Sequence, residues 1–291
     1  MSTIREIKGR IVSTKSSEKI TGAMKMISTA KLRKAEGALM HMVPYREQLL
    51  SSITHLLGAD GDFPSPLTEK RPVSRFAFVV VGSEEGLCGA FNIYLLKKLW
   101  ERITEVRAAY GRDVKITVYP VGKRLTTMMS HISGVEISRS AYLTAKSDSS
   151  VIRDFTDGIV SRFLTKDLDE VEIIYSFYKS MASQPVKTRT LLPVNAANLS
   201  AGGEEDFQNP YIYEPSRCDI FEALLPMFVR VNMQESIYNG RTSEQAARVM
   251  AMQAASDNAK KLLEELQLDY NKLRQQGITN ELLDIVGGSM Q

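Results

Sequence analysis

The placement of proline divides the chain into three parts. All ten prolines lie between Pro44 and Pro226, which leaves the first 43 and the last 65 residues without one. A proline inside a helix removes a backbone donor and clashes with the preceding turn. Long proline-free stretches rich in Ala, Met, Leu, Lys and Glu are therefore typical of uninterrupted helices. We expect one long helix at each end of the chain.

The expected length of the C-terminal helix limits how the chain can fold. A helix from near Met227 to near Ile285 would be about 90 Å long, at about 1.5 Å per residue. A compact globule of 291 residues has a diameter of only roughly 50 Å. The helix therefore projects from any such globule, and its apolar positions need a partner that covers them.

The N-terminal helix is the candidate partner, because both ends carry apolar residues at three- and four-residue steps. We predict a long antiparallel coiled coil of the two ends, imperfect because the periodicity slips between Thr14 and Glu18. The alternative, two helices folded onto an ordinary core, has the length argument against it. The two predicted stripes are Ile4, Ile7, Ile11, Met24, Ile27, Leu32, Ala35 and Leu39, and Ala247, Met250, Ala251, Ala254, Asn258, Leu262, Leu266, Tyr270 and Leu273.

Strand and helix patterns alternate in the middle of the chain. This order is typical of a mostly parallel sheet with helices on its faces, and the short joint before the last strand favours an antiparallel final pair. The fold class predicted is α/β, with a Rossmann-like domain and a five-stranded sheet. The domains predicted are an N-terminal helix (1–57), the α/β domain (75–194), a loop (195–216) and a C-terminal helix (217–291). The expected strands are Arg75–Gly82, Lys115–Val121, Val135–Ser138, Val171–Tyr178 and Val186–Leu192, and the expected helices are Phe91–Tyr110, Lys123–His131 and Ser147–Leu164.

Composition excludes several classes of function. The longest apolar run, Phe76–Val81, is far short of the roughly 20 residues that a membrane span needs. The two cysteines and three histidines are scattered, so we expect no metal, no cofactor and no catalytic site. Residues 1–40 hold nine cations against three anions, which suits nucleic acid, anionic lipid or an acidic protein surface. No aromatic residue precedes Tyr45, so the stacking platform of a single-strand binder is missing.

Two loops are candidates for function. Gly82–Gly89 follows the first strand, where a nucleotide would bind in such a sheet. Its spacing fits no phosphate-binding motif, and Glu84 and Glu85 would repel a phosphate, so we expect no nucleotide there. The loop is either a solvated tip or a docking surface. The second loop ends in Tyr211, Tyr213 and Glu214, which read either as a contact patch or as rings buried against the domain.

Five blocks of sequence, in one order along nearly the whole chain, carry a resemblance to a known family. They are Ile4-Arg5-Glu6-Ile7-Lys8 with Lys19-Ile20-Thr21-Gly22-Ala23-Met24-Lys25-Met26-Ile27-Ser28 and Lys31-Leu32-Arg33-Lys34-Ala35; Gly86-Leu87-Cys88-Gly89-Ala90-Phe91-Asn92; Tyr213-Glu214-Pro215; Ser243-Glu244-Gln245-Ala246-Ala247-Arg248 with Ser256-Asp257-Asn258; and Tyr270-Asn271-Lys272-Leu273-Arg274-Gln275 with Ile278-Thr279-Asn280-Glu281. The set resembles the gamma subunit of F-type ATP synthase. The match begins close to Met1, which favours a bacterial enzyme without a presequence.

The resemblance implies a rotor without chemistry of its own. The terminal helices would form an asymmetric shaft inside a ring of alternating alpha and beta subunits, with the α/β domain at its foot. The chain would couple ion-driven rotation of the c-ring, with protons or sodium ions, to conformational changes in the catalytic ring. The partners implied are the alpha, beta and epsilon subunits and the c-ring, with no nucleic acid. The complex would lie on the cytoplasmic face of the bacterial plasma membrane.

The same resemblance suggests contact residues. Met24, Arg274, Gln275 and Thr279 stand where the family's shaft faces the catalytic ring, and Tyr211, Tyr213 and Glu214 where its foot meets the c-ring. Glu84 and Glu85 replace a usual Asp-Arg or Asp-Lys pair at a contact with acidic beta-subunit residues, and Gly22 stands where lysine is common.

Two other functions stay open from the residues alone. One is an α/β ligand-binding enzyme that dimerises through a helical arm, which a catalytic constellation or a phosphate-binding loop would favour. The other is a basic coiled-coil scaffold on nucleic acid, which would need cations beyond residues 1–40.

Overall fold

The structure is a computed structural model that describes residues 3–57, 65–130, 134–138, 143–144, 146–195 and 213–288. The chain divides into two compact units. The terminal unit comprises Met1–Ala30 and Arg248–Gln291, and the sheet unit comprises Lys31–Ala247. The elements are α1 (Ile4–Leu57), β1 (Arg75–Val81), α2 (Phe91–Tyr110), β2 (Lys115–Val121), α3 (Lys123–Met129), β3 (Glu136–Ile137), α4 (Ser149–Leu164), β4 (Glu170–Ser176), β5 (Val186–Leu192) and α6 (Arg217–Gly288).

The sheet has five strands in the order β3-β2-β1-β4-β5. Strands β3, β2, β1 and β4 pair in parallel, and β5 runs antiparallel to β4. The mostly parallel five-stranded sheet and its antiparallel last pair are thus confirmed. The strand order reverses between β1 and β4, because the chain adds strands on one side of β1 and then on the other. This point is where doubly wound sheets bind their ligands.

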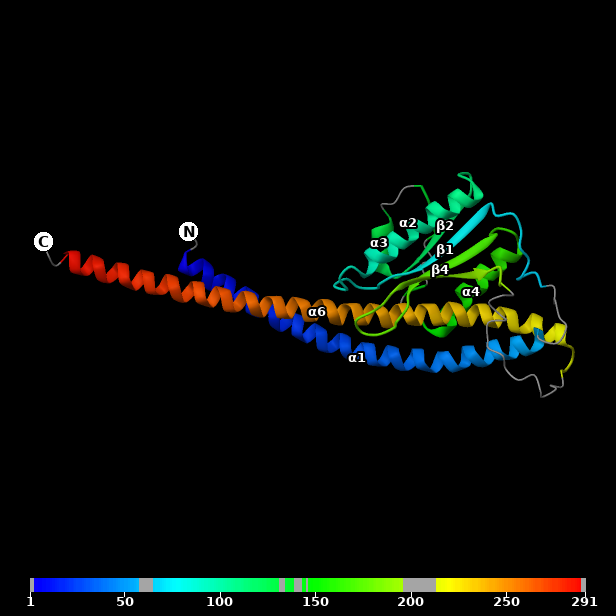
Figure 1. The fold of residues 1–291 in the computed structure, drawn as a ribbon, viewed down its shortest axis with the longest axis horizontal. Coiled ribbons are helices and arrows are strands. Elements are labelled where there is room, and N and C mark those ends of the chain that lie inside the picture. Colours follow the sequence, from blue (N-terminus) through cyan, green and yellow to red (C-terminus); the bar gives the residue numbers. More distant parts are fainter. Residues whose placement is uncertain are drawn as a thin grey trace. The chain divides into compact units, whose positions relative to one another are not determined.

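Strand β1 is apolar at every residue from Phe76 to Val81, because both faces of the strand are buried. Phe76, Phe78 and Val80 belong to one core, on the face that α2 and α3 cover. Ala77, Val79 and Val81 belong to the other, with residues of α4 and of the sheet-unit parts of α1 and α6. A strand buried on both faces reads as a continuous apolar run rather than as an alternating one. The sheet unit therefore has three layers (Figure 1), with helices on both faces of the sheet.

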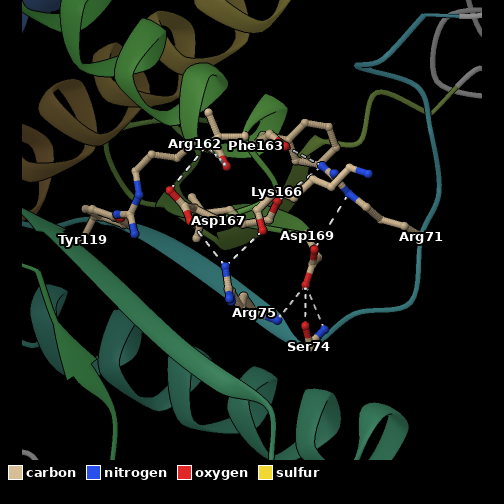
Figure 2. A network of polar contacts seen from close by, with 11 residues as sticks. Arg71, Ser74, Arg75, Tyr119, Arg162, Phe163, Lys166, Asp167 and Asp169 are labelled. Atoms are coloured by element: carbon tan, nitrogen blue, oxygen red, sulfur yellow. Dashed lines mark hydrogen bonds and ion pairs between the residues drawn. The ribbon is translucent and has the colours of Figure 1, made fainter.

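A polar network around Asp169 lies at the amino ends of β1 and β4, at the end of the sheet opposite the ligand-binding position (Figure 2). One oxygen of Asp169 accepts hydrogen bonds from the backbone N–H of Ser74 at 2.9 Å, the Ser74 hydroxyl at 3.0 Å and the backbone N–H of Arg75 at 2.9 Å. Arg71 donates to the carbonyl of Phe163 at 2.6 Å, near the end of α4. Burial alone would raise the pKa of Asp169, but these donors outweigh it and lower the pKa. The network joins the amino ends of β1 and β4 to the end of α4.

Each long helix continues across a proline. Helix α1 contains Pro44, and α6 begins at Arg217 and contains Pro226. Ile53, beyond Pro44, is completely buried, and so is Leu225, immediately before Pro226. Burial of a leucine or isoleucine side chain contributes about 1.5–3 kcal/mol, which offsets a proline's cost of about 3 kcal/mol when several such residues flank it.

The terminal unit, taken by itself, pairs the two ends of the chain in antiparallel fashion. A Cβ atom placed on Gly277 of α6 would lie 3.7 Å from the Cδ1 atom of Ile4, at the start of α1. Ile7 of α1 and Leu266 of α6 are buried, at 5% and 4% exposure. The first turn of α1 therefore lies beside α6 near Gly277.

The predicted apolar stripes are wrong at several positions. Ile27 is 56% exposed, Met250 45% and Leu262 38%. Ser28 and Ser256 are instead buried, at 3% and 6%. Small side chains such as serine allow two helix backbones to approach closely. Because serine is not apolar, the apolar pattern of the sequence did not include these two positions.

Candidate docking surfaces and the crevice of the sheet

Helix α6 lies against the carboxyl ends of β1 and β4, where a doubly wound sheet would bind a ligand. A Cβ atom on Gly240 would come within 2.5 Å of Cγ1 of Val81, the last residue of β1. The Ser243 hydroxyl donates to the carbonyl of Ser176, the last residue of β4, at 2.9 Å. Gly240 is the residue type that this approach requires, because any side chain would overlap Val81. The chain's own helix thus takes the place of a ligand.

The joint between β4 and β5 is tied to both long helices within the sheet unit. The Asn239 side chain accepts from the backbone N–H of Tyr178 at 3.1 Å and donates to the carbonyl of Glu235 at 3.1 Å. The Tyr178 hydroxyl donates to the carboxylate of Glu36 in α1. Burial, then the hydrogen bond to Glu36 and its charge, raise the pKa of Tyr178 to about 12. One residue of the joint therefore contacts α1 through its side chain and α6 through its backbone.

A buried carboxylate, Glu235, forms ion pairs that link α6 to the sheet and to α1. Glu235 accepts from Arg189 of β5 at 2.7 Å, and its carboxylate lies 3.6 Å from Nε of Arg46 of α1. Arg189 also donates to Asn232 at 3.0 Å. The Glu235 side chain is only 6% exposed, against 28% for Arg46 and 26% for Arg189. Sequence reasoning missed this network; the available signal was a carboxylate two residues after Met233 in a largely apolar segment.

The loop Gly82–Gly89 holds its two carboxylates in ion pairs. Glu84 accepts from the backbone N–H of Lys123, the first residue of α3, at 3.3 Å, and lies 3.9 Å from its ammonium. Lys146 donates to Glu85 at 2.6 Å, and this hydrogen bond raises the pKa of Lys146. The Glu84 side chain is only 8% exposed, so the solvated tip is the wrong interpretation for it. Contact of Glu84 and Glu85 with another subunit stays a prediction.

The shaft residues predicted to face the catalytic ring all belong to the terminal unit. Arg274, Gln275 and Thr279 are exposed on adjacent turns of α6, and Met24 is half-buried on α1. The Thr279 hydroxyl donates back to the carbonyl of Gln275 at 2.9 Å. Within the described residues, the side chains of Arg274 and Gln275 make no hydrogen bond or ion pair. Both are free to reach a partner.

The proposed foot contact is described only in part. Tyr211 lies outside the described residues. Tyr213 is half-buried, its hydroxyl donates to the carbonyl of His55 at 3.5 Å, and the Arg217 guanidinium lies 4.7 Å from its ring centroid. Glu214 is exposed. The tyrosine ring thus packs partly against the chain, and Glu214 is the side chain that faces outward.

No group of three or more His, Cys, Asp or Glu side chains in the described part of the chain is arranged to hold a metal ion. Nor does any described helix contain a stretch long and apolar enough to cross a membrane.

Comparison with known proteins places the chain in a family. A family model described as ATP synthase matches residues 3–290. The ATP synthase gamma chains of Bacteroides fragilis and Phocaeicola vulgatus are 40% and 38% identical, over 100% of this chain and of each relative. In the mitochondrial ATP synthase of Euglena gracilis (OSCP/F1/c-ring, rotational state 3), a chain with 22% identity has the same fold, with a TM-score of 0.65 over 99% of this chain and 93% of that one. The chain belongs to the ATP synthase gamma-chain family.

Proposed function

We propose that this chain is the central-stalk subunit of an ATP synthase, which couples ion-driven rotation of a c-ring to conformational changes in the catalytic ring. The observation that carries the proposal is the anchoring of α6. This single helix runs from Arg217 to Gly288, and within the sheet unit Glu235, a carboxylate buried between two arginines, fixes α6 to β5 and α1. A subunit that transmits torque through a helix needs that helix to be held firmly where it packs on the sheet.

The chain is a non-catalytic subunit in this role. A single asymmetric rotor presents a different face to each of several equivalent catalytic subunits. Each of them is then biased toward a different conformation by its differential contacts with the rotor. The alternative of a ligand-binding α/β enzyme is not favoured, because Gly240 and Ser243 of α6 lie where the sheet would hold its ligand.

The partners follow from the family and from the solved complexes of similar fold, which contain F1 and c-ring parts. Arg274, Gln275, Thr279 and Met24 would contact the alpha and beta subunits, with Glu84 and Glu85 as a further beta contact. Tyr211, Tyr213 and Glu214 would contact the c-ring, and the epsilon subunit would be a further partner. The complex would be peripheral, on the cytoplasmic face of a bacterial membrane, and would use protons or sodium ions.

Charge reversal at the foot tests this function. In membrane vesicles that contain the whole complex, Glu214→Lys is expected to reduce ATP-driven ion pumping while ATP hydrolysis by the detached head stays near the wild-type rate. The matched control is Asp154→Lys, since Asp154 is an acidic residue whose side chain is 76% exposed on α4. Equal loss of pumping and of head hydrolysis in Glu214→Lys would show that the residue supports the fold instead of a contact. If the chain did not co-purify with alpha and beta subunits at all, the function itself would be wrong.

A further inference from the structure

A cavity in the sheet unit lies beside the loop Gly82–Gly89, and Glu84 and Lys146 form part of its wall. Its volume is 310 Å³, at the lower end of the range of about 300–1,000 Å³ that small-molecule sites occupy. Helix α1, the loop after β1, the segment before α4 and helix α6 all contribute to its wall. Its polar lining includes the side chains of Lys31, Lys34, Lys146, Arg241 and Gln245.

Two buried polar atoms of this cavity wall have no hydrogen-bond partner within the described residues. They are Nε of Arg241, a donor, and Oε1 of Gln245, an acceptor. Buried polar atoms in folded proteins are nearly always paired, so each unpaired one calls for an explanation. Another part of the Arg241 guanidinium donates to the carbonyl of Ser147, which fixes the side chain in place. A donor and an acceptor on one wall suit a ligand that offers both.

The charges around the cavity favour an anion. Lys31 and Lys34 are exposed on α1 and make no ion pair within the described residues. Glu84 also lines the cavity, and by sequence alone Glu84 and Glu85 would repel a phosphate. In the structure Lys123 and Lys146 form ion pairs with these two carboxylates and offset their charges. With Glu84 and Lys146 paired to residues outside the wall, the three cations Lys31, Lys34 and Arg241 face one carboxylate, Glu244, which leaves an excess of two positive charges. A guanidinium and two ammonium groups around one small space are a typical oxyanion site.

We propose that this cavity binds hydrogen phosphate. Its oxygens would accept from Arg241 Nε and from the ammonium groups of Lys31 and Lys34, and its P–OH group would donate to Gln245 Oε1. Sulfate has the same shape but no proton at neutral pH, so it would leave Gln245 unpaired. The site therefore predicts a preference for phosphate over sulfate, which a merely basic surface does not produce. Lys31 and Lys34 belong to α1 and Arg241 to α6, so the bound anion would join the two helices.

Calorimetric titration of the full chain tests the proposal at neutral pH and constant ionic strength. Inorganic phosphate is expected to bind saturably with one site per chain, and sulfate more weakly. The double substitution Lys31→Gln with Lys34→Gln should weaken phosphate binding at least about tenfold, since it removes two charge-assisted contacts. The matched control is Lys15→Gln with Lys19→Gln, two exposed cations of α1 in the terminal unit, which should bind like the wild type. Equal weakening in both double variants would show that only net charge matters and would overturn the proposal.

Two further arms identify the ligand. Gln245→Met keeps the size of the side chain but removes its acceptor, so it should abolish the preference for phosphate over sulfate; a preference that persists unchanged refutes the assigned role of Gln245. ATP should bind at least about tenfold more weakly than phosphate, because a cavity of 310 Å³ near the lower limit of ligand sites cannot also take a nucleoside. ATP binding as tight as phosphate would overturn the assignment to the free ion. Binding of a glutamate-rich peptide without any phosphate binding would show a protein-docking surface instead.

Discussion

Substitution of Glu235 by glutamine tests the anchoring of α6 most directly. The change keeps the shape of the side chain but removes the charge that Arg189 and Arg46 face at 2.7 and 3.6 Å. Removing one partner of a buried ion pair costs about 3–5 kcal/mol, because the other charge is left without compensation. Both arginine side chains are about a quarter exposed, at 26% and 28%, so water recovers part of this loss. We expect a loss of about 2–3 kcal/mol in the free energy of unfolding.

Urea denaturation of the full chain measures this loss, followed by the fluorescence of Trp100, the single tryptophan. A change of 1 kcal/mol shifts the melting temperature of a unit of this size by about 2–4 °C, so thermal unfolding should move down by about 4–12 °C. The matched control is Glu222→Gln, an exposed carboxylate on the same helix, which should change the free energy of unfolding by less than about 0.5 kcal/mol. If the two variants unfold at the same urea concentration, the ion pairs of Glu235 contribute nothing to stability and the proposed anchoring of α6 is wrong.

Three further predictions follow from particular contacts. Gly240→Ala should lower the free energy of unfolding by about 1–3 kcal/mol through overlap with Val81, whereas Gly37→Ala, with nothing within 4 Å of its Cβ, should be neutral or stabilising in the same denaturation. Because the pKa of Tyr178 is raised to about 12, its contact with Glu36 contributes its full stability below about pH 10, and this contribution is lost as the pH rises through 12. In a pH series of melting temperatures, Tyr178→Phe should therefore make the fall of the melting temperature above about pH 10 less steep than in the wild type. An equally steep fall in both proteins would contradict the prediction. Arg274→Ala with Gln275→Ala should lower ATP turnover of the assembled head without lowering the melting temperature of the chain; wild-type turnover would show that both side chains are merely solvated.

Local patterns were sufficient for the sheet and its helices. The Phe and Val content of Arg75–Gly82 predicted a strand there, and the short joint before Val186 predicted an antiparallel last pair; both are present. These features depend on neighbours in sequence, because strand propensity and turn length are local properties. Helix α2 was predictable for the same reason: its apolar residues recur with helical period, and the helix ends before Gly111.

The contacts between distant residues could not be predicted in this way. Glu235 meets Arg189 and Arg46 only because β5, α1 and α6 converge, and nothing in the sequence pairs these three positions. The seam of the terminal unit was misassigned at Ile27 because the buried residue beside it is Ser28, and a hydrophobic pattern does not count a serine. Arg241 and Gln245 likewise face one cavity from a single helix whose surroundings the sequence does not reveal.

The position of α6 against the sheet has a consequence for synthesis of the chain. The five strands are complete once Leu192 has been made, but one face of the sheet is covered in part by α6 residues up to Ile237, and Gly240 completes the contact at Val81. The ribosome adds about 5–20 residues per second, so the distance from Leu192 to Ala247 takes about 3–11 s. During that time the apolar side chains of β1 on this face, Val79 and Val81, lack their final cover. We therefore expect this face of the nascent sheet to stay only partly covered until α6 has been made, and a fragment from Arg75 to Leu192 to aggregate.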